Sequence, residues 1–313
     1  MKILIAGELN VDLVLQNYRS FPALGSEVLV EDASLTLGSA SAICASGLAK
    51  LGNQVVFAGK LGADSWGDLC LGWLNTLKID CSLVTRDPSI KTGITVSLTH
   101  AKDRALVTYL GSIAELRAED ISDSNLQSCR HLHVSSFFLQ EKLRPRVKQL
   151  LSRAHRLGLT TSLDPGFDPL ERWGEDLIDT LTEVDVFLPN DVELRAITGH
   201  VDPAAALQSL KNGRTLTIAK LGAEGCATWM ENCLVRVPAF PVDPIDTTGA
   251  GDSFNAGFLH AWLGSGQVSE AMLFAAACGA LSTLALGGTT SQPSEEEAWE
   301  FIDARTARSQ GGL

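Results

Sequence analysis

Short apolar segments alternate with longer segments of helical pattern along most of this chain. The short segments are five or six residues long and rich in β-branched or apolar residues, which is typical of buried strands. Regular alternation of strand and helix indicates an α/β fold, in which a doubly wound, mainly parallel sheet is flanked by helices on both faces. We therefore predict strands at residues 2–6, 54–58, 131–135, 160–164, 184–188 and 215–220, and helices at residues 41–51, 66–77, 143–157 and 169–181.

Two segments depart from this alternation. Residues 27–37 and 92–110 have the pattern of strands that follow one another with no intervening helix. The second segment is expected to turn back on itself around residues 101–104. Such strands predict a small β-sheet, inserted at about 13–37 and 92–111, that covers an α/β active site as a lid. The alternative is an extension of the edge of the main sheet.

The composition bounds the size and the partners of the protein. The chain has 313 residues, of which 45% are hydrophobic, and this is enough to bury a large core. No repeat or linker is evident, so residues 1–313 are predicted to form a single domain. The formal net charge is −12, which argues against a nucleic-acid partner because phosphate backbones require clustered Lys and Arg.

Cysteine usage and hydropathy indicate a cytoplasmic protein. The seven cysteines are scattered without a CxxC pair, which is typical of reduced thiols and not of disulfides or a zinc site. The apolar part of residues 1–7 is too short for a signal peptide. The stretch 271–286 contains Gly279, Ser282 and Thr283, so it suits a buried helix better than a membrane span. We expect no membrane partner.

The most informative stretch is a glycine-rich turn, Asp-Thr-Thr-Gly-Ala-Gly-Asp, at residues 246–252. Small residues let the backbone approach a ligand closely, and the helix that is expected to follow presents free N–H groups at its positive end. Such a terminus is a natural anion site. Asp252 lies in the first turn of that helix, where it could accept the proton of an attacking hydroxyl as a general base. The alternative is that Asp252 only caps the helix and the glycines only turn the chain.

Neither a P-loop nor a dinucleotide-binding GxGxxG pattern is present. Instead, residues 246–259 (DTTGAGDSFNAGFL) closely resemble the C-terminal signature of the ribokinase-like (PfkB-type) carbohydrate kinase family. The resemblance implies a ribokinase-like fold and an ATP-dependent kinase that phosphorylates a hydroxyl of a sugar or sugar-like molecule. It further implies Asp252 as the catalytic base and Gly249, Ala250 and Gly251 as the anion hole.

Other motifs resemble the nucleotide side of this family. Asn190 follows a predicted strand, at the edge where open α/β sheets bind ligands. Asn190 and Glu193 could form a capping box, whereas the resemblance implies that they position Mg²⁺ through water beside the phosphates of ATP. The segments that resemble ATP-binding elements contain Lys220, Gly222, Gly225 and Gly279.

The acceptor side carries the main departures from the family. Asn10 and Asp12 lie just after the first predicted strand, and by resemblance Asp12 accepts hydrogen bonds from sugar hydroxyls. Gly38 is kept, but Ser39 stands where the family has a second glycine, and Ile43 where it has an asparagine. Because isoleucine forms no hydrogen bond, we expect this change to shift the choice of acceptor without abolishing catalysis.

Several alternatives remain for the acceptor. The sequence Asp-Pro-Gly at residues 164–166 departs from the more common Asp-x-Asn and predicts a less polar pocket than in a typical ribokinase. A nucleoside kinase of the same family is the main alternative, since Ile43 would suit a base. A sugar phosphate should require additional basic residues, for which Arg104 is a candidate. A non-catalytic ligand sensor on the same fold is a further alternative.

The resemblance also bears on ions and assembly. In relatives a monovalent cation, K⁺, binds near the start of the glycine-rich turn, and Asp246, Thr248 and Ser291 fall at suitable places. ATP and Mg²⁺ are thus the expected cofactors, with K⁺ as an optional addition. Exposed lid strands are sheet edges, and pairing them between two subunits would cover them, so a homodimer is expected.

Overall fold

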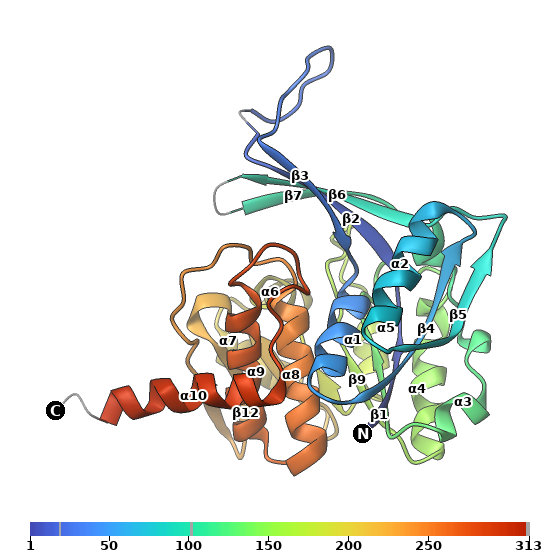
Figure 1. The fold of residues 1–313 in the computed structure, drawn as a ribbon. Coiled ribbons are helices and arrows are strands. Elements are labelled where there is room, and N and C mark those ends of the chain that lie inside the picture. Colours follow the sequence, from blue (N-terminus) through green and yellow to red (C-terminus); the bar gives the residue numbers. More distant parts are fainter. Residues whose placement is uncertain (19, 101–102, 311–313) are drawn as a thin grey trace.

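The computed structural model describes residues 1–18, 20–100 and 103–310. A large sheet with helices on both faces forms the body, and a smaller sheet lies over one edge of it (Figure 1). Within the described ranges, no helix is long and apolar enough to cross a membrane.

The large sheet has nine strands in the order β13-β12-β11-β10-β9-β8-β1-β4-β5. The strands from β11 to β5 pair in parallel, and β12 and β13 complete one edge as an antiparallel hairpin. The chain winds outward from β1 in both directions, through β4 on one side and β8 on the other, which is the doubly wound topology predicted. The strands are β1 (Lys2–Ala6), β4 (Gln54–Gly62), β5 (Asp80–Asp87), β8 (His131–Val134), β9 (Thr160–Leu163), β10 (Val186–Phe187), β11 (Leu216–Lys220), β12 (Cys226–Met230) and β13 (Cys233–Val237).

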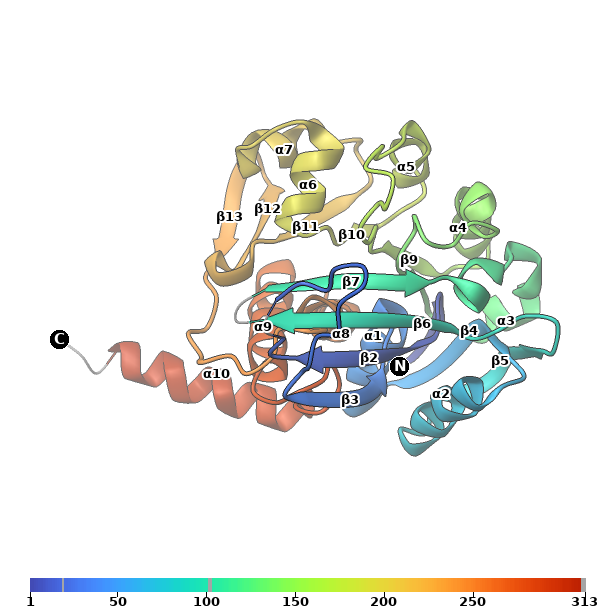
Figure 2. The same ribbon diagram turned by 90° about the horizontal axis from the view of Figure 1, so that it is seen from above.

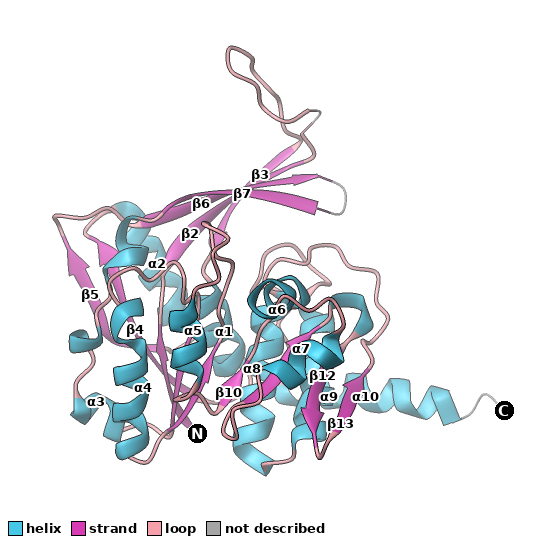
Figure 3. Ribbon diagram, turned by 180° about the vertical axis from the view of Figure 1, so that it is seen from behind, coloured by secondary structure: helices cyan, strands magenta, loops and turns pink. Residues whose placement is uncertain are grey.

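Successive residues of the central strand β1 supply two separate cores. Ile3 and Ile5 pack into one hydrophobic cluster, whereas Leu4 and Ala6 pack into the other. Burial on both faces explains why this strand is apolar at every position from Ile3 to Ala6 instead of alternating. Figure 3 shows the helices that cover the two faces. The first core is closed by α1 (Ala40–Lys50), α2 (Ser65–Thr76), α8 (Ala250–Ser265), α9 (Val268–Ser282) and α10 (Glu295–Gln310), and the second by α3 (Asp123–Gln127), α4 (Val147–Arg156), α5 (Glu175–Leu181), α6 (Asp191–Thr198) and α7 (Pro203–Ser209).

A second, four-stranded sheet has the order β3-β2-β6-β7 and spans the top of the molecule (Figures 1 and 2). It is separate from the large sheet, so the predicted small sheet is confirmed and the alternative of an edge extension is wrong. The predicted hairpin is also confirmed by the antiparallel pairing of β6 with β7, although its turn, residues 101–102, lies outside the described residues. Its strands are β2 (Asn10–Gln16), β3 (Asp32–Leu37), β6 (Gly93–His100) and β7 (Asp103–Tyr109).

The boundaries of the first lid segment differ from the prediction. β2 begins at Asn10, before the predicted insertion point at residue 13, and β3 begins only at Asp32, so residues 27–31 are not a strand. The chain between these strands projects away from the body (Figure 1), and Leu29 is 74% exposed there. The apolar pattern was misleading because a strand also needs a neighbouring strand to pair with.

Two further predictions need correction. The helix predicted over residues 169–181 begins only at Glu175, because the Asp168 carboxylate accepts hydrogen bonds from the backbone N–H groups of Leu170, Arg172 and Trp173 and holds a turn instead. The strands β5, β12 and β13 were not predicted. The two residues between β12 and β13, Glu231 and Asn232, both have positive φ, as a two-residue hairpin turn requires.

Candidate active site

The carboxyl ends of the parallel strands converge on one cavity. Glu8 follows β1, Ser136 follows β8, Asp164 follows β9 and Asn190 follows β10, while Lys220 ends β11. All five residues line a cavity of about 1280 Å³, and residues of the lid line its other side. Ligands of open α/β sheets bind at this edge. The strand topology therefore explains why polar residues far apart in the sequence meet here.

The glycine-rich turn forms another wall of this cavity. Gly249 precedes α8 with φ 72°, and a side chain there would lie only 2.8 Å from Cα of Gly288, so both the conformation and the close approach require glycine. Gly249 holds the N-cap position, so Asp252 is not the capping residue. Ala250, Gly251 and Asp252 line the cavity from the first turn of α8. A helix start and a carboxylate are thus presented together, as predicted.

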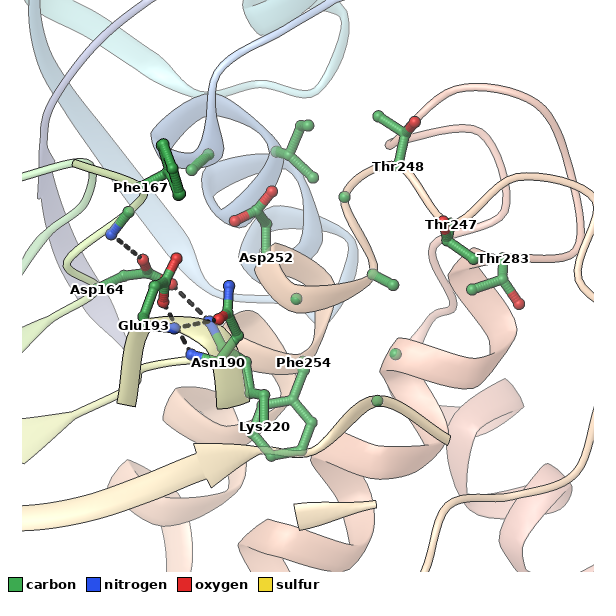
Figure 4. Close-up of a pocket in the computed structure, with 18 of the residues that line it drawn as sticks. Asp164, Phe167, Asn190, Glu193, Lys220, Thr247, Thr248, Asp252, Phe254 and Thr283 are labelled. Atoms are coloured by element: carbon green, nitrogen blue, oxygen red, sulfur yellow. Dashed lines mark hydrogen bonds and ion pairs between the residues drawn. The ribbon is translucent and has the colours of Figure 1, made fainter. Parts of the chain in front are cut away.

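A buried polar cluster lies beside Asp252 (Figure 4). Lys220 Nζ is 2.6 Å from Asp164 Oδ2, and Asn255 Nδ2 donates to the same oxygen at 2.6 Å. Burial, the largest single effect, would lower the pKa of Lys220, but the carboxylates of Asp164, Glu193 and Asp252 together outweigh it and raise the pKa. Burial, the largest single effect, would raise the pKa of Asp164, but Lys220 together with the hydrogen bond from Asn255 and the nearby His133 outweighs burial and lowers the pKa. Both groups are therefore charged, and the ammonium of Lys220, predicted to contact ATP, is directed at Asp164 and Asn255.

Asn190 and Glu193 form the capping box that the sequence suggested. The Glu193 N–H donates to Asn190 Oδ1 at 2.8 Å, and the Asn190 N–H donates to Glu193 Oε2 at 2.8 Å. Glu193 is only 5% exposed, and burial, followed by the nearby Asp164, raises its pKa to about 7. Both residues also line the cavity, so the cap fixes the carboxylate at the cavity wall. The part of the chain that the structure describes holds no group of three or more His, Cys, Asp and Glu that could bind a metal directly.

The underside of the lid is polar and hydrogen-bonded. Asn10 Nδ2 on β2 donates to Asp12 Oδ1 at 2.9 Å and to Thr95 Oγ1 on β6 at 3.4 Å. Thr95 in turn is 3.1 Å from the hydroxyl of Thr108 on β7. These four residues and Ser97 all line the cavity, because strand residues two apart share one face of the lid. The predicted acceptor residues Asn10 and Asp12 are thus brought together with lid hydroxyls that the sequence analysis did not single out.

Gly38 and Ser39 support this region in different ways. Gly38 does not line the cavity, but a side chain there would lie 2.0 Å from Asp12 Oδ1, so glycine leaves room for this carboxylate. Ser39 lines the cavity with φ 78° and ψ 125°, a conformation that strongly favours glycine. Its hydroxyl donates to Glu8 O at 2.6 Å and accepts from Ala42 N at 3.0 Å, so it caps α1.

Ile43 packs beneath the glycine-rich turn. It is 3% exposed, and a side chain added at Gly249 would lie 2.9 Å from Ile43 Cγ2. The Ile43 side chain also packs against Gly288, where an added Cβ would lie 2.7 Å from Ile43 Cδ1. Ile43 borders the cavity, and in addition it supports the turn that presents Asp252.

Sequence reasoning missed Glu8. Its side chain is 3% exposed, Oε1 accepts from Ser41 N at 3.2 Å and from Ser136 Oγ at 2.8 Å, and Oε2 accepts from Ser41 Oγ at 2.5 Å. Glu8 therefore ties the end of β1 to α1 and to the loop after β8. Its position, one glycine after an apolar strand, was the available signal.

The predicted nucleotide-side and cation residues divide into two groups. Thr248 and the ATP-side glycines line the cavity, whereas Asp246 and Ser291 do not. Asp246 Oδ1 accepts from Thr248 N and Oδ2 accepts from Gly287 N, both at 2.9 Å, so this carboxylate links the glycine-rich turn to the loop after α9. Ser291 Oγ donates to Ser282 O at 2.7 Å. The ATP-side glycines are Gly222, Gly225 and Gly279.

Comparison with known proteins agrees with this geometry. The chain is 30% identical over 310 residues to the ATP-dependent ribose-1-phosphate kinase of Halopiger xanaduensis, covering 97% of this chain and 99% of that protein. It is 29% identical over 283 residues to Probable fructokinase-2 of Arabidopsis thaliana, covering 85% and 86%. Among solved structures, the chain is similar to the ribokinase of Arabidopsis thaliana in complex with ribose and ATP, with a TM-score of 0.81 and 21% sequence identity. The match covers 96% of this chain and 98% of that one.

The family model described as pfkB family carbohydrate kinase matches residues 1–295. This match includes the lid, the acceptor side and the glycine-rich turn. The chain therefore belongs to the pfkB family of carbohydrate kinases and is a phosphotransferase.

Proposed function

We propose that this phosphotransferase transfers the γ-phosphoryl group of ATP to a hydroxyl of an uncharged sugar or sugar-like molecule, with Asp252 as the general base. The observation that carries the proposal is that one cavity is lined by the polar lid residues, by Asp252 and its glycine-rich turn, and by the predicted ATP-side residues. An acceptor held under the lid and a nucleotide held on the other side would both reach Asp252.

The chemistry follows from this placement. Asp252 takes the proton of the acceptor hydroxyl as that oxygen attacks the γ-phosphorus. The helix start at Gly249–Gly251 stabilises the negative charge on the transferring group. Residues Asn190 and Glu193 fit a water-mediated Mg²⁺ site, since their oxygens lie at the cavity wall, and the cation would neutralise phosphate charge. Closure by the lid excludes water, which favours transfer over hydrolysis.

The charges of the cavity favour an acceptor without a phosphate. Its acceptor side carries the carboxylates of Glu8, Asp12 and Asp164. Among the described residues that line the cavity, Lys220 is the only lysine or arginine, and it is paired with Asp164. A phosphorylated acceptor would bring further negative charge next to these carboxylates. The side chain of Arg104, the candidate for binding such a phosphate, lies outside the described residues.

A nucleoside is the second candidate acceptor. Phe167 lines the cavity and is 52% exposed, and Leu139 and Pro169 lie along the same wall. An exposed aromatic ring offers a face on which a planar base could stack. The Asp-Pro-Gly segment that precedes Phe167 replaces a more polar one, which agrees with a less polar wall.

An acceptor screen tests the proposal. Purified protein with ATP and Mg²⁺ is assayed for ADP release with hexoses, pentoses, nucleosides and sugar phosphates, with and without K⁺. We expect turnover with an uncharged polyol, and a fall in kcat of about 10²–10⁴-fold for Asp252→Asn. Asp179→Asn, which removes an exposed carboxylate on α5, is the control and should match wild type. Wild-type-like turnover of Asp252→Asn would rule out the base, and a strict preference for sugar phosphates would rule out the uncharged acceptor.

The lid also supports the proposed homodimer. Its outer strands β3 and β7 are the edges of the small sheet, and Leu35 and Val107 on them are exposed. Sheet edges of this kind are covered by pairing with another strand. Molar mass from light scattering, compared between wild type and Val107→Lys, tests this assembly. The seven unpaired cysteines agree with the cytoplasmic location that we propose.

A further inference from the structure

Lys50, the last residue of α1, directs its ammonium group at three backbone carbonyls of one loop. Lys50 Nζ is 2.6 Å from Thr289 O, 3.3 Å from Thr290 O and 3.4 Å from Gln292 O. None of the ion pairs found among the described residues involves Lys50. Carbonyl oxygens that point at one place repel each other, and a cation between them removes that repulsion.

Both ends of this loop, residues 287–292, contact the catalytic turn. At one end, Gly287 N donates to Asp246 Oδ2 at 2.9 Å, and Gly288 lies against Gly249 so closely that no side chain fits between them. At the other end, Gln292 Nε2 donates to Ser253 Oγ at 2.9 Å, and Ser253 directly follows Asp252. The loop therefore braces the turn before and after the residues that line the cavity.

Gln292 also joins the loop to α1. Its Nε2 donates to Ile43 O at 2.9 Å, and Gln292 itself is 5% exposed. Ile43 and Lys50 both belong to α1, so this helix holds the loop at two points seven residues apart. The side chain of Ile43 meanwhile packs against Gly249 and Gly288. Helix, loop and catalytic turn thus form one connected unit.

We propose that Lys50 is a positioning residue for phosphoryl transfer. Its ammonium group is a cation built into the chain: it gathers the carbonyls of residues 289, 290 and 292, and thereby holds the loop 287–292 against the turn that presents Asp252. Burial lowers the pKa of Lys50, and the charge of Glu297 opposes part of this effect. Both agree with an ammonium group that is partly buried. The effect on catalysis rests on the proposed function, whereas the bracing of the turn does not.

Hydrogen exchange followed by mass spectrometry tests the bracing directly. Lys50→Met keeps the aliphatic stem and removes the charge. We expect faster exchange in peptides that cover residues 246–253 and 287–292, and no change in β8 and β9. Gln292→Leu should give the same pattern, and Lys148→Met, which breaks an exposed ion pair on α4, should leave both regions as in wild type. Unchanged exchange at residues 246–253 in Lys50→Met would overturn the proposal, whatever reaction the protein catalyses.

Kinetics with the acceptor identified in the screen tests the catalytic consequence. Because small displacements of a reacting group are costly, we expect kcat of Lys50→Met to fall on the order of 10²-fold with little change in the KM of the acceptor. Lys50→Arg keeps a positive charge and should lie between Lys50→Met and wild type. An Arg variant no better than Met would show that the charge is not what matters and would overturn the cation role. If wild type itself shows no transfer, the proposed function fails while the exchange measurement still decides on the brace.

Discussion

Lys220 and Asp164 form an ion pair at the wall of the catalytic cavity, with Nζ 2.6 Å from Oδ2 and side-chain exposures of 11% and 5%. Asn255 completes the pair by donating to Asp164 and accepting from Lys220. Taking two charges out of water is costly, and their mutual attraction compensates only while both are present. The pair therefore ties β9 to β11 and α8 at the point where acceptor and nucleotide sides meet.

Removing one partner of this pair should destabilise the protein strongly. Asp164→Asn leaves the Lys220 charge buried without a counter-ion, and we expect it to lower the free energy of unfolding by about 3–5 kcal/mol. The double variant Asp164→Asn with Lys220→Met should recover part of that loss, because no charge is left buried. Urea unfolding at pH 7 measures both. A double variant that is less stable than Asp164→Asn would contradict this account.

The same pair sets a pH window. The pKa of Asp164 is lowered, so its contribution to stability is present above the ordinary carboxyl pKa and is lost as pH falls through the folded value. The pKa of Lys220 is raised, so its contribution is present below its ordinary value and lost as pH rises through the folded one. Between those limits the pair should add no pH dependence.

Glu193 should make stability fall as pH rises toward neutrality. Its pKa is raised by burial from 4.5 to about 7, so between these values the folded protein holds more protons than the unfolded chain. The free energy of unfolding is then greatest below the pKa of the unfolded chain. It decreases, by on the order of 3 kcal/mol, as the pH rises from there to about 7. Glu193→Gln should remove this slope while keeping an oxygen to cap α6. Urea titrations of both proteins from pH 5 to pH 8 give the difference, and parallel curves would refute the assignment.

Ser39 should tolerate glycine better than alanine, the reverse of the usual order within helices. Alanine keeps the unfavourable φ of 78° and loses the hydroxyl that caps α1. Glycine loses the same hydroxyl but relieves backbone strain of about 1–3 kcal/mol. We expect Ser39→Gly to be more stable than Ser39→Ala by about 1 kcal/mol or more. Thermal and urea unfolding of the two variants decide, and equal stabilities would show that the backbone is unstrained there.

Ile43→Asn should reduce turnover with every acceptor instead of creating a ribokinase. The isoleucine side chain packs against both Gly249 and Gly288, and asparagine would fill less of that space and bring a polar group there. We expect a loss of about 1–3 kcal/mol of stability together with a lower kcat. The check is the acceptor screen repeated on the variant. A gain of activity on ribose would show that this position controls acceptor choice directly.

The sequence alone determined the class of fold and the centre of the chemistry. Strand-helix alternation and the segment 246–252 are local signals: the first depends on periodic burial, and the second on backbone that only small residues allow. The structure bears out the alternation and the separate lid, and it places Asn10, Asp12, Asn190, Glu193 and Asp252 around one cavity. The roles that we give these residues in catalysis remain predictions.

Only the tertiary structure decided which polar groups are already engaged. Lys220 was predicted to contact ATP, but β9 and β11 flank β10 in the sheet, and this arrangement brings Asp164, at the end of β9, to the ammonium group of Lys220. Ile43 looked like a lost sugar contact, but α1 packs it against Gly249. The partners of Glu8 and Lys50 could not be predicted, because they lie 33 to 242 residues away along the chain. Such contacts arise from the crossing of strands and helices, and local pattern does not contain them.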